Sequence, residues 1–496
     1  MVIYNRTLSI PKRVRNKNPK IGFTVGAVLQ PVSMSVRSIA RSTSAPASGS
    51  RRRTHLFRSS AAALVAAAVF AVAGCGNTYR PVITAINPVG PAGQPQKYAV
   101  AISSTGTSTP GLATIVDFSG DTVLITVPVG KNPQYFNVDA QGFNGYVING
   151  DSSISSFDIS NSLLASGVLV STLLPGANPV SIFPQGSSVY ITEPGRNAIG
   201  QFTGTPPALK QELGLGVATN PVYVVGYASA QRLYALSQGN GTSPGTASAI
   251  DVPSQTITTT VPVGVNPVYG IMTSDFKRAY IMNKGSNTVS VINAQTNTLD
   301  NFTGSTGTGT IAVGTAPVWA DFATTRSEMV VANQGSGTNN GSVSIISIPL
   351  CNASATVTNP NCDATNPVDA AGFGTVLANV PVGVNPIVVA VLADGTRAYV
   401  ANAGDPSLPC ATVPVAGVST GCSVSVVNLT TNTVTATIPV TGHPSFMALT
   451  NGTPTGKVYV TSKDNNTMTI IRTDIDAVST SVDLQGKGVM VRTTLP

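Results

Sequence analysis

The sequence predicts an all-β protein, and three of its features carry this prediction. Only 10% of the residues are charged and 6% are aromatic, whereas Gly alone contributes 48 residues. Such a composition suits short strands and tight turns better than long helices. A short phrase of the type Gly-x-Asn-Pro recurs seven times with variations; one copy is VPVGVNPVYGIM at 261–272. Between its copies apolar and polar residues alternate. Alternation with a period of two is typical of strands that bury one face.

The first 74 residues are predicted to be a leader that export removes. They hold 12 of the 28 Lys and Arg and none of the 20 Asp and Glu. Basic residues at 51–53 precede an apolar run at 61–73, which is shorter than the ~20 residues that span a bilayer and is typical of a signal peptide. From position 75 onward, 16 basic and 20 acidic residues leave a net charge of −4. No basic stripe remains there for nucleic acid, so we expect no nucleic-acid partner.

The apolar run of the leader ends in Val72-Ala73-Gly74-Cys75. This ending resembles the lipobox of bacterial lipoproteins, in which the cysteine carries a diacylglycerol and becomes the mature N-terminus. The resemblance implies a membrane anchor at Cys75, a Pro- and Gly-rich linker over 75–96 and a location at the cell envelope. Gly76 is not the Asp that retains such proteins at the inner membrane of enterobacteria, which favours the outer membrane. A plain signal peptide followed by a chance cysteine is the alternative.

The repeated phrase divides the rest of the chain into similar units. Its prolines are separated by 46, 42, 46, 50, 69 and 58 residues: Pro133, Pro179, Pro221, Pro267, Pro317, Pro386 and Pro444. The clearest unit, 384–442, predicts strands at 387–392 and 397–402 around an Asp-Gly turn, and two more strands from SVSVVN and TVTATIPV. Four short antiparallel strands in every 40–50 residues are typical of the blades of a β-propeller, which stack and close into a ring.

The number of blades depends on the two ends of the repeat array. Full repeats are predicted at 131–176, 177–216, 217–264, 265–314, 315–383, 384–442 and 443–487. The flanking segments 97–130 and 488–496 supply three strands and one strand. One blade shared between the termini would close the ring without leaving open edges, which favours eight blades. Seven blades remain the alternative if 81–130 is a separate cap.

The phrase itself suits the connection from the outermost strand of one blade to the innermost strand of the next. We expect its Gly to provide conformational freedom, its Asn to cap the turn and its Pro to fix the entry into the strand. The last copy has His443 in place of the Asn, and this is the only histidine after the leader. His443 is therefore interpreted as a turn residue rather than a catalytic base.

These patterns resemble the YVTN family of β-propellers, which is known from surface-layer and secreted bacterial and archaeal proteins. The resemblance rests on AYVAN at 398–402, AYIMN at 279–283, NTVSVIN at 287–293 and ATIPV at 436–440. It extends over about 95–488 and is weakest in the second and fifth repeats. It implies a propeller that works outside the cytoplasm.

Other patterns that suggest chemistry fall on predicted turns or in low-complexity sequence, and no catalytic residue, metal or cofactor is expected from them. They are the S-x-x-K match at 274–277, the acidic residues Asp464, Asp474 and Asp476, and the Gly-rich stretch 304–310. Tyr269 and Trp319 begin predicted innermost strands. They could line the channel and stack on a ligand, although packing between blades is favoured.

Four cysteines follow Cys75: Cys351, Cys362, Cys410 and Cys422. An even number in an oxidising compartment favours disulfides, and no C-x-x-C spacing suggests a zinc site or a redox pair. Three pairings are possible. Local pairing, Cys351 with Cys362 and Cys410 with Cys422, is favoured because each pair lies within one predicted insertion.

The sequence therefore predicts a lipid-anchored binding scaffold of the cell envelope with a protein or glycan partner. Long loops on rigid scaffolds often carry binding, so we expect partner contacts at the insertions 349–375 and 403–422, on opposite faces of the ring. The alternative is a lactonase-like or quinoprotein-like enzyme with its site at the channel mouth. One His and three Glu after the leader argue against an enzyme. A purely structural envelope component is a third possibility.

Overall fold

The computed structural model describes residues 98–159, 167–217, 219–302, 309–349, 372–410, 421–450 and 456–494. The predicted leader, the linker with Cys75, and the pair Cys351 and Cys362 lie outside these residues. The described chain forms strands β1 to β33 and two short 3-10 turns, η1 (Pro194–Arg196) and η2 (Thr324–Arg326). The all-β prediction is confirmed. No helix in this part of the chain is long and apolar enough to cross a membrane.

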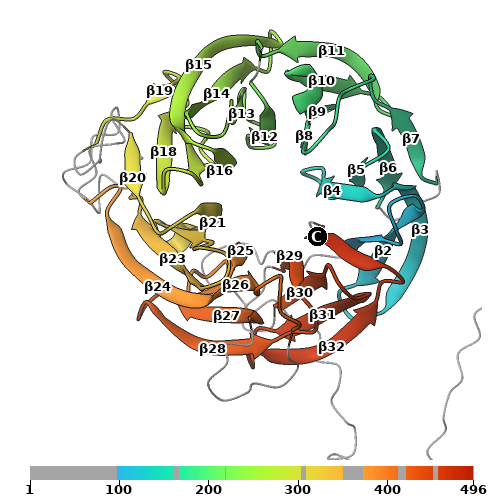
Figure 1. Ribbon diagram of the computed structural model, residues 1–496, viewed down its shortest axis with the longest axis vertical. Coiled ribbons are helices and arrows are strands. Elements are labelled where there is room, and N and C mark those ends of the chain that lie inside the picture. Colours follow the sequence, from blue (N-terminus) through green and yellow to red (C-terminus); the bar gives the residue numbers. More distant parts are fainter. Residues whose placement is uncertain are drawn as a thin grey trace, which may run out of the picture. The chain divides into compact units, whose positions relative to one another are not determined.

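The strands form eight antiparallel sheets arranged as the blades of a ring (Figure 1). In seven blades the strands follow one another outward from the channel. Their bounds are β4 Pro133–Val138, β5 Asn144–Asn149, β6 Ser153–Asp158 and β7 Leu169–Thr172; β8 Ile182–Gln185, β9 Ser188–Glu193, β10 Ala198–Thr203 and β11 Ala208–Gly214; β12 Pro221–Val225, β13 Arg232–Ser237, β14 Pro244–Asp251 and β15 Thr256–Val265; β16 Pro267–Met272, β17 Arg278–Asn283 and β18 Thr288–Asn293, with β19 Thr298–Leu299 and β20 Thr310–Ala312 both paired to β18; β21 Pro317–Ala323, β22 Glu328–Asn333, β23 Asn340–Ser347 and β24 Val376–Val384; β25 Pro386–Val391, β26 Arg397–Ala403, β27 Cys422–Asn428 and β28 Thr433–Pro439; β29 Pro444–Leu449, β30 Lys457–Ser462, β31 Thr467–Arg472 and β32 Ala477–Asp483.

The eighth blade combines the two ends of the described chain. Three strands come from the N-terminal side, β1 (Tyr98–Ser104), β2 (Pro110–Asp117) and β3 (Val123–Lys131), and β33 (Lys487–Thr493) is the innermost strand. The strand order is β3-β2-β1-β33, with β1 and β33 antiparallel. The predicted split blade is confirmed, and the alternative of seven blades is wrong.

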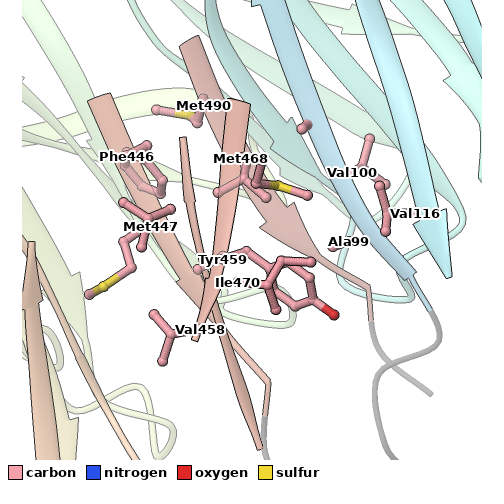
Figure 2. Close-up of a cluster of buried hydrophobic side chains, with 14 of the residues drawn as sticks. Ala99, Val100, Val116, Phe446, Met447, Val458, Tyr459, Met468, Ile470 and Met490 are labelled. Carbon is pink, nitrogen blue, oxygen red and sulfur yellow. The ribbon is translucent and has the colours of Figure 1, made fainter. Parts of the chain in front are cut away.

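The split blade packs on the preceding blade through a continuous apolar core (Figure 2). Val100 of β1 and Val116 of β2 are fully buried with Tyr459 of β30 and Ile470 of β31. Burying such surface stabilises by roughly 25 cal/mol per Å². Closure therefore rests on side-chain packing as well as on the β1–β33 ladder.

In the turns between blades, the residue with the left-handed backbone conformation is not the one that was expected. The Asn before Pro has a positive φ, for example 52° at Asn266 and 56° at Asn385. The Gly two positions earlier, at 264 and 383, has no positive φ. The expected conformational freedom of the Gly is therefore not used at these two turns, whereas Gly176, in the copy at 173–184, does have a positive φ of 78°. Asn takes the left-handed conformation because its short polar side chain tolerates this region better than most residues do.

The Gly of the phrase is needed for a close approach. A Cβ on Gly264 would lie 2.6 Å from Cγ of Asn283, and a Cβ on Gly383 would lie 2.7 Å from Cγ of Asn402. Asn283 is the last residue of the second strand of its blade, and Asn402 is the last but one. Asn283 Nδ2 donates to Ser290 Oγ at 2.9 Å. The phrase, the Asn of the second strand and the Ser of the third strand thus form one packing unit, which explains why they recur together.

The turns between blades share a face with the loops that join second and third strands. In the blade of β25 to β28, Ala403 N donates to Asn385 O at 2.8 Å and Gly404 N donates to Val384 O at 3.0 Å. The loop 404–421, between β26 and β27, therefore leaves the sheet beside the turn, as predicted. The loop 348–375 joins β23 to β24 and so leaves on the opposite face.

Candidate functional site

The innermost strands place a belt of aromatic rings in the central channel. The second residue after the Pro that begins each strand is aromatic in five blades: Tyr135, Tyr223, Tyr269, Trp319 and Phe446. We call these five residues the aromatic belt. Tyr223 and Tyr269 have ring centroids 5.0 Å apart, and Tyr269 stacks on Trp319 at 3.9 Å. Trp319 also meets Phe446 edge to face at 5.2 Å, although one whole blade separates their strands in the ring.

A cavity of about 300 Å³ lies next to the belt. Its lining comes from the five innermost strands β16, β21, β25, β29 and β33: Tyr269, Trp319, Ala320, Asp321, Val388 to Val391, Met447, Ala448, Leu449, Arg492 and Thr493. The cavity thus reaches from the belt to the ends of these strands, which are the side away from the turns between blades. Tyr269 and Trp319 were expected mainly to pack between blades. Their rings do so, and they also form a wall of the cavity.

Arg492 of β33 is the cationic group of this cavity. Its guanidinium carbon lies 4.7 Å from the ring centroid of Phe446 and 5.8 Å from that of Trp319. These distances allow a cation–π interaction. Its Nε is buried and has no hydrogen-bond acceptor among the described residues.

Arg492 differs in this respect from the other arginines of the described chain. Six of the seven pair with a carboxylate of the propeller, and Arg492 is the exception. The six pairs are Arg196–Glu212, Arg232–Asp251, Arg278–Asp300, Arg326–Glu328, Arg397–Asp476 and Arg472–Asp474. The propeller balances the charges of its other arginines and leaves this one facing the channel.

Asp321 of β21 is the acidic group of the same cavity. One oxygen accepts the backbone N–H of Val391 at 2.8 Å, and the other accepts that of Phe322 at 2.8 Å. Burial raises the pKa of Asp321 to about 6, although these two hydrogen bonds act in the opposite direction. The carboxyl is therefore held in a fixed orientation between two adjacent blades.

Small side chains create the space between the two charged groups. Asp321 occupies the fourth position after Pro317, which begins β21, and Arg492 occupies the fourth position after Gly488, the residue of β33 at the place of that Pro. At the same position, the two blades between them carry Ala390 and Ala448. Larger side chains, none of which lines the cavity, occupy this position on three other blades: Phe183, Val225 and Ile271. The cavity exists because two neighbouring blades have Ala where others have larger groups.

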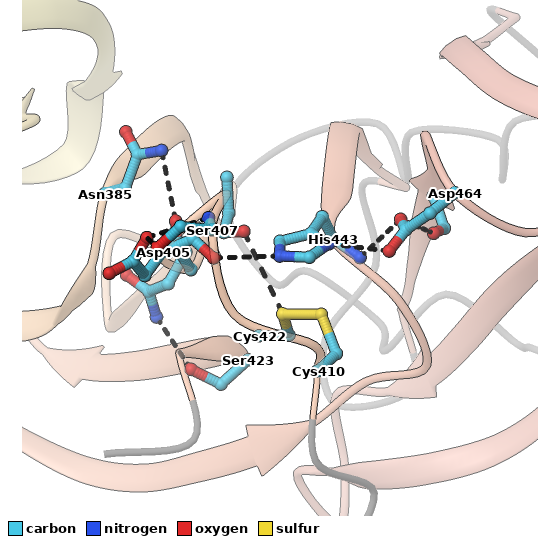
Figure 3. Close-up of a disulfide and its surroundings, with 12 residues drawn as sticks. Asn385, Asp405, Ser407, Cys410, Cys422, Ser423, His443 and Asp464 are labelled. Atoms are coloured by element: carbon cyan, nitrogen blue, oxygen red, sulfur yellow. Dashed lines mark hydrogen bonds and ion pairs between the residues drawn. A yellow bond between two sulfur atoms is a disulfide. The ribbon is translucent and has the colours of Figure 1, made fainter. Parts of the chain in front are cut away.

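The face that carries the turns between blades has a second polar cluster (Figure 3). Sγ atoms of Cys410 and Cys422 are joined in a disulfide, with Cα atoms 5.5 Å apart. His443 Nδ1 lies 2.6 Å from Asp464 Oδ2, and His443 Nε2 lies 3.1 Å from the carbonyl oxygen of Asp405. The loop 404–421 is thereby tied to the turn that enters the next blade.

The two sulfur atoms and a ring nitrogen of His443 lie within 4.8 Å of one another. Because the sulfurs are bonded to each other, they do not present thiolates to a metal ion in this structure. The backbone N–H of His443 donates to Asp464 Oδ1 at 2.8 Å, as a residue that orders a turn does. The pairing of Cys351 with Cys362 falls outside the described residues and stays a prediction.

The remaining sequence candidates lie on hairpin turns. Residues 274–277 join β16 to β17, and Asp275 Oδ1 accepts the backbone N–H of Lys277 at 3.0 Å. Asp476 accepts the phenol of Tyr399 at 2.5 Å and pairs with Arg397 at 2.6 Å, which links two blades. Asp474 pairs with Arg472. Of the stretch 304–310, only its last two residues are described.

Sequence reasoning missed Arg492 and Asp321. Both lie inside strands, where no turn chemistry or motif marks them. A signal was present nonetheless, because the fourth position after the Pro of the phrase, or after Gly488 in the C-terminal strand, carries a charge on only these two innermost strands. Aligning the eight innermost strands position by position would have revealed it.

Comparison with known proteins supports the fold. No family model matches this chain, and no curated protein matches it. Among solved structures, the chain is similar to the dihydro-heme d1 dehydrogenase NirN in complex with DHE, with a TM-score of 0.55, 11% identity, and coverage of 81% of this chain and 76% of that one. It is also similar to apo AztD from Citrobacter koseri, with a TM-score of 0.51, 10% identity, and coverage of 80% and 98%. At such identities the likeness shows a shared propeller fold and nothing about the activity.

Proposed function

We propose that this chain is a lipid-anchored binding propeller of the bacterial cell envelope, of the YVTN type, which holds a small ligand in its central channel. The observation that carries the proposal is the cavity beside the aromatic belt, where Arg492 has no carboxylate partner among the described residues. Ligand sites are commonly apolar cavities with a few convergent polar groups. The cavity fits this description, because aromatic rings form one wall and Arg492 and Asp321 are its two charged groups.

The envelope location rests on the sequence of the leader. A basic segment, a short apolar run and the ending Val-Ala-Gly-Cys support export and acylation at Cys75. Changing Cys75→Ala is expected to move the protein from the membrane fraction to the soluble fraction. A Cys75→Ala protein that stays in the membrane fraction would contradict the lipid anchor.

A protein or glycan partner is proposed at the loop 404–421, in keeping with the sequence prediction. The disulfide and the contact of Asp405 with His443 hold the start of this loop against the neighbouring blade. A loop held in place loses less conformational entropy on binding than a free one, which favours affinity. The role of this loop is independent of the channel cavity.

The channel function is tested by filling the cavity. In the double variant Ala390→Leu/Ala448→Leu, the added side chains occupy the space between Arg492 and Asp321. Small molecules retained by the native protein would be identified by mass spectrometry and confirmed by thermal shift. Ala208→Leu on the exposed outer strand β11 is the matched control. We expect the ligand to be lost only from the double variant, and retention by both variants would refute the channel site.

Asp321 supports the alternative of a propeller enzyme, because a carboxyl whose pKa is raised to about 6 can exchange protons near neutral pH. A lactonase-like hydrolysis would use it as a general base. Comparing lactone hydrolysis by the wild-type protein and by Asp321→Asn separates the two functions. Turnover that disappears in Asp321→Asn would favour the enzyme over the binding protein.

A further inference from the structure

We propose that the channel cavity selects a compact organic carboxylate whose far end carries a hydrogen-bond donor, as in an ω-amino acid. Its carboxylate would bind Arg492, its body would pack on the aromatic belt, and its donor would reach Asp321. This inference rests on the proposed function of the channel as a ligand site and adds the chemical class of the ligand.

The argument begins with the cost of leaving Arg492 unpaired. A buried N–H without an acceptor destabilises a fold by about 1–3 kcal/mol, and more when the group is charged. The rings of Phe446 and Trp319 offset part of this cost by cation–π attraction, but they accept no conventional hydrogen bond. An anion entering the cavity would supply the missing acceptor.

The geometry favours a carboxylate over a more highly charged anion. The planar guanidinium matches the two oxygens of a carboxylate in a bidentate pair. Asp321 lines the same cavity, so a dianion such as a phosphate monoester would be repelled by a second negative charge. The volume of about 300 Å³ is at the low end for ligand sites, which limits the ligand to a small molecule.

The walls define the body of the ligand. The belt residues Tyr269 and Trp319 provide a flat surface on one side, and Ala390 and Ala448 leave room along the line from Arg492 to Asp321. A planar or apolar body would gain dispersion and hydrophobic energy there. A sugar, which carries hydroxyls all round, would find few partners on these walls.

Asp321 determines which group the ligand needs at the end away from its carboxylate. Each of its oxygens already accepts one backbone N–H, and each retains a further acceptor position. The backbone contacts hold the carboxyl still, so an ammonium or amide donor would meet a pre-oriented acceptor. A ligand with both groups would be distinguished from one that has only a single charged end.

The test uses three probes with the same benzene ring as the body: 4-(aminomethyl)benzoate, benzoate and benzylamine. They carry both charged groups, the carboxylate alone and the ammonium alone. Binding to the protein from residue 75 onward would be measured by titration calorimetry at millimolar concentrations. We expect 4-(aminomethyl)benzoate to bind best, benzoate to bind more weakly and benzylamine not to bind.

Variants of the protein test which residue binds each end of the ligand. Arg492→Gln is expected to lower the affinity for both probes that carry a carboxylate by about tenfold or more. Arg492→Lys is expected to restore part of this affinity. Asp321→Asn should weaken the binding of 4-(aminomethyl)benzoate, and it should not weaken the binding of benzoate. Arg472→Gln, which alters a paired arginine on β31, is the control, and melting curves check that every variant is folded.

Two outcomes would overturn the assignment. One is a failure of both carboxylates to bind; the other is equal binding by folded Arg492→Gln. If the native protein retains another ligand that Ala390→Leu/Ala448→Leu loses and Arg492→Gln keeps, the ligand class is wrong while the channel function stands. If the double variant loses nothing, the channel function itself fails.

Discussion

Glu193 shows how one residue can depart from the pattern of its blade. It ends the second strand β9, at the position that Asn283 and Asn402 hold elsewhere. In those blades the Asn amide donates to hydroxyls of the third strand, whereas here Gly200 replaces the Ser. The carboxyl is fully buried, and neither oxygen has a donor among the described residues. Burial, followed by the nearby carboxyl of Glu212, raises the pKa of Glu193 to about 8 against the opposing effect of Arg196.

This pKa predicts a pH-dependent stability. The folded protein keeps a proton on Glu193 that the unfolded chain, with a pKa near 4.5, releases earlier. The free energy of unfolding is therefore expected to fall as the pH rises from about 4.5 to about 8. In Glu193→Gln, the free energy of unfolding should lose this part of its dependence on pH. Urea unfolding measured between pH 4.5 and pH 8 would show the change. Glu328→Gln, which alters an ion-paired carboxyl, is the control, and an equal slope in wild type and Glu193→Gln would contradict the prediction.

At the scale of elements, the repeated phrase acts through contacts rather than through turn flexibility. Asn385 takes the left-handed conformation, and Gly383 lets the chain pass against Asn402. Asn402 Nδ2 in turn donates to Ser423 Oγ at 3.1 Å and to Ser425 Oγ at 2.9 Å. The second and third strands of one blade are thereby joined to the outermost strand of the preceding blade. The unit recurs because the blade needs all of these residues together.

Gly383→Ala is therefore expected to destabilise the propeller by about 1–3 kcal/mol, the usual range for overpacking a buried site. Its Cβ would lie 2.7 Å from Cγ and Nδ2 of Asn402. Gly214→Ala is the matched control, because no atom lies within 4 Å of a Cβ there and its backbone is not left-handed. Chemical denaturation of the two variants measures the difference. Equal midpoints would show that the close approach at Gly383 carries no energetic weight.

At the scale of the whole molecule, the ring is held closed by contacts between the ends of the chain. Tyr98 N donates to Thr494 Oγ1 at 3.1 Å, and Thr494 N donates to Tyr98 O at 2.9 Å. Lys457 Nζ pairs with Asp121 Oδ1 at 2.7 Å and joins the last blade to the split blade. Because each blade packs its two sheet faces on the two neighbouring blades, opening one junction exposes two faces at once.

Removing residues 488–496 is expected to abolish cooperative unfolding. The deletion takes away most of β33, leaves β1 as an open edge and exposes the core beside the channel. Calorimetry would record a broad transition at lower temperature. Val491→Ala keeps the strand and removes only part of one fully buried side chain, so it should lower the midpoint less and preserve a single transition. A truncated protein that melts like the wild type would refute closure by β33.

The sequence by itself determined the all-β class, the blade repeat and the eightfold ring. Alternating strands, turn residues and repeat spacing are local properties, and the strand missing at one end matched the extra strand at the other. It also placed His443 and residues 274–277 on turns, because turn chemistry depends on near neighbours in the chain.

Only the tertiary structure decided which residues meet in the channel. Arg492 and Asp321 are 171 positions apart in the sequence and come together because three consecutive blade-to-blade steps separate their strands. Whether a charge inside a strand is paired depends on which side chains of other blades reach it, and no local pattern contains that information. The same holds for the Gly of the repeated phrase, such as Gly383, since its role follows from an Asn that approaches it only after the blade has folded.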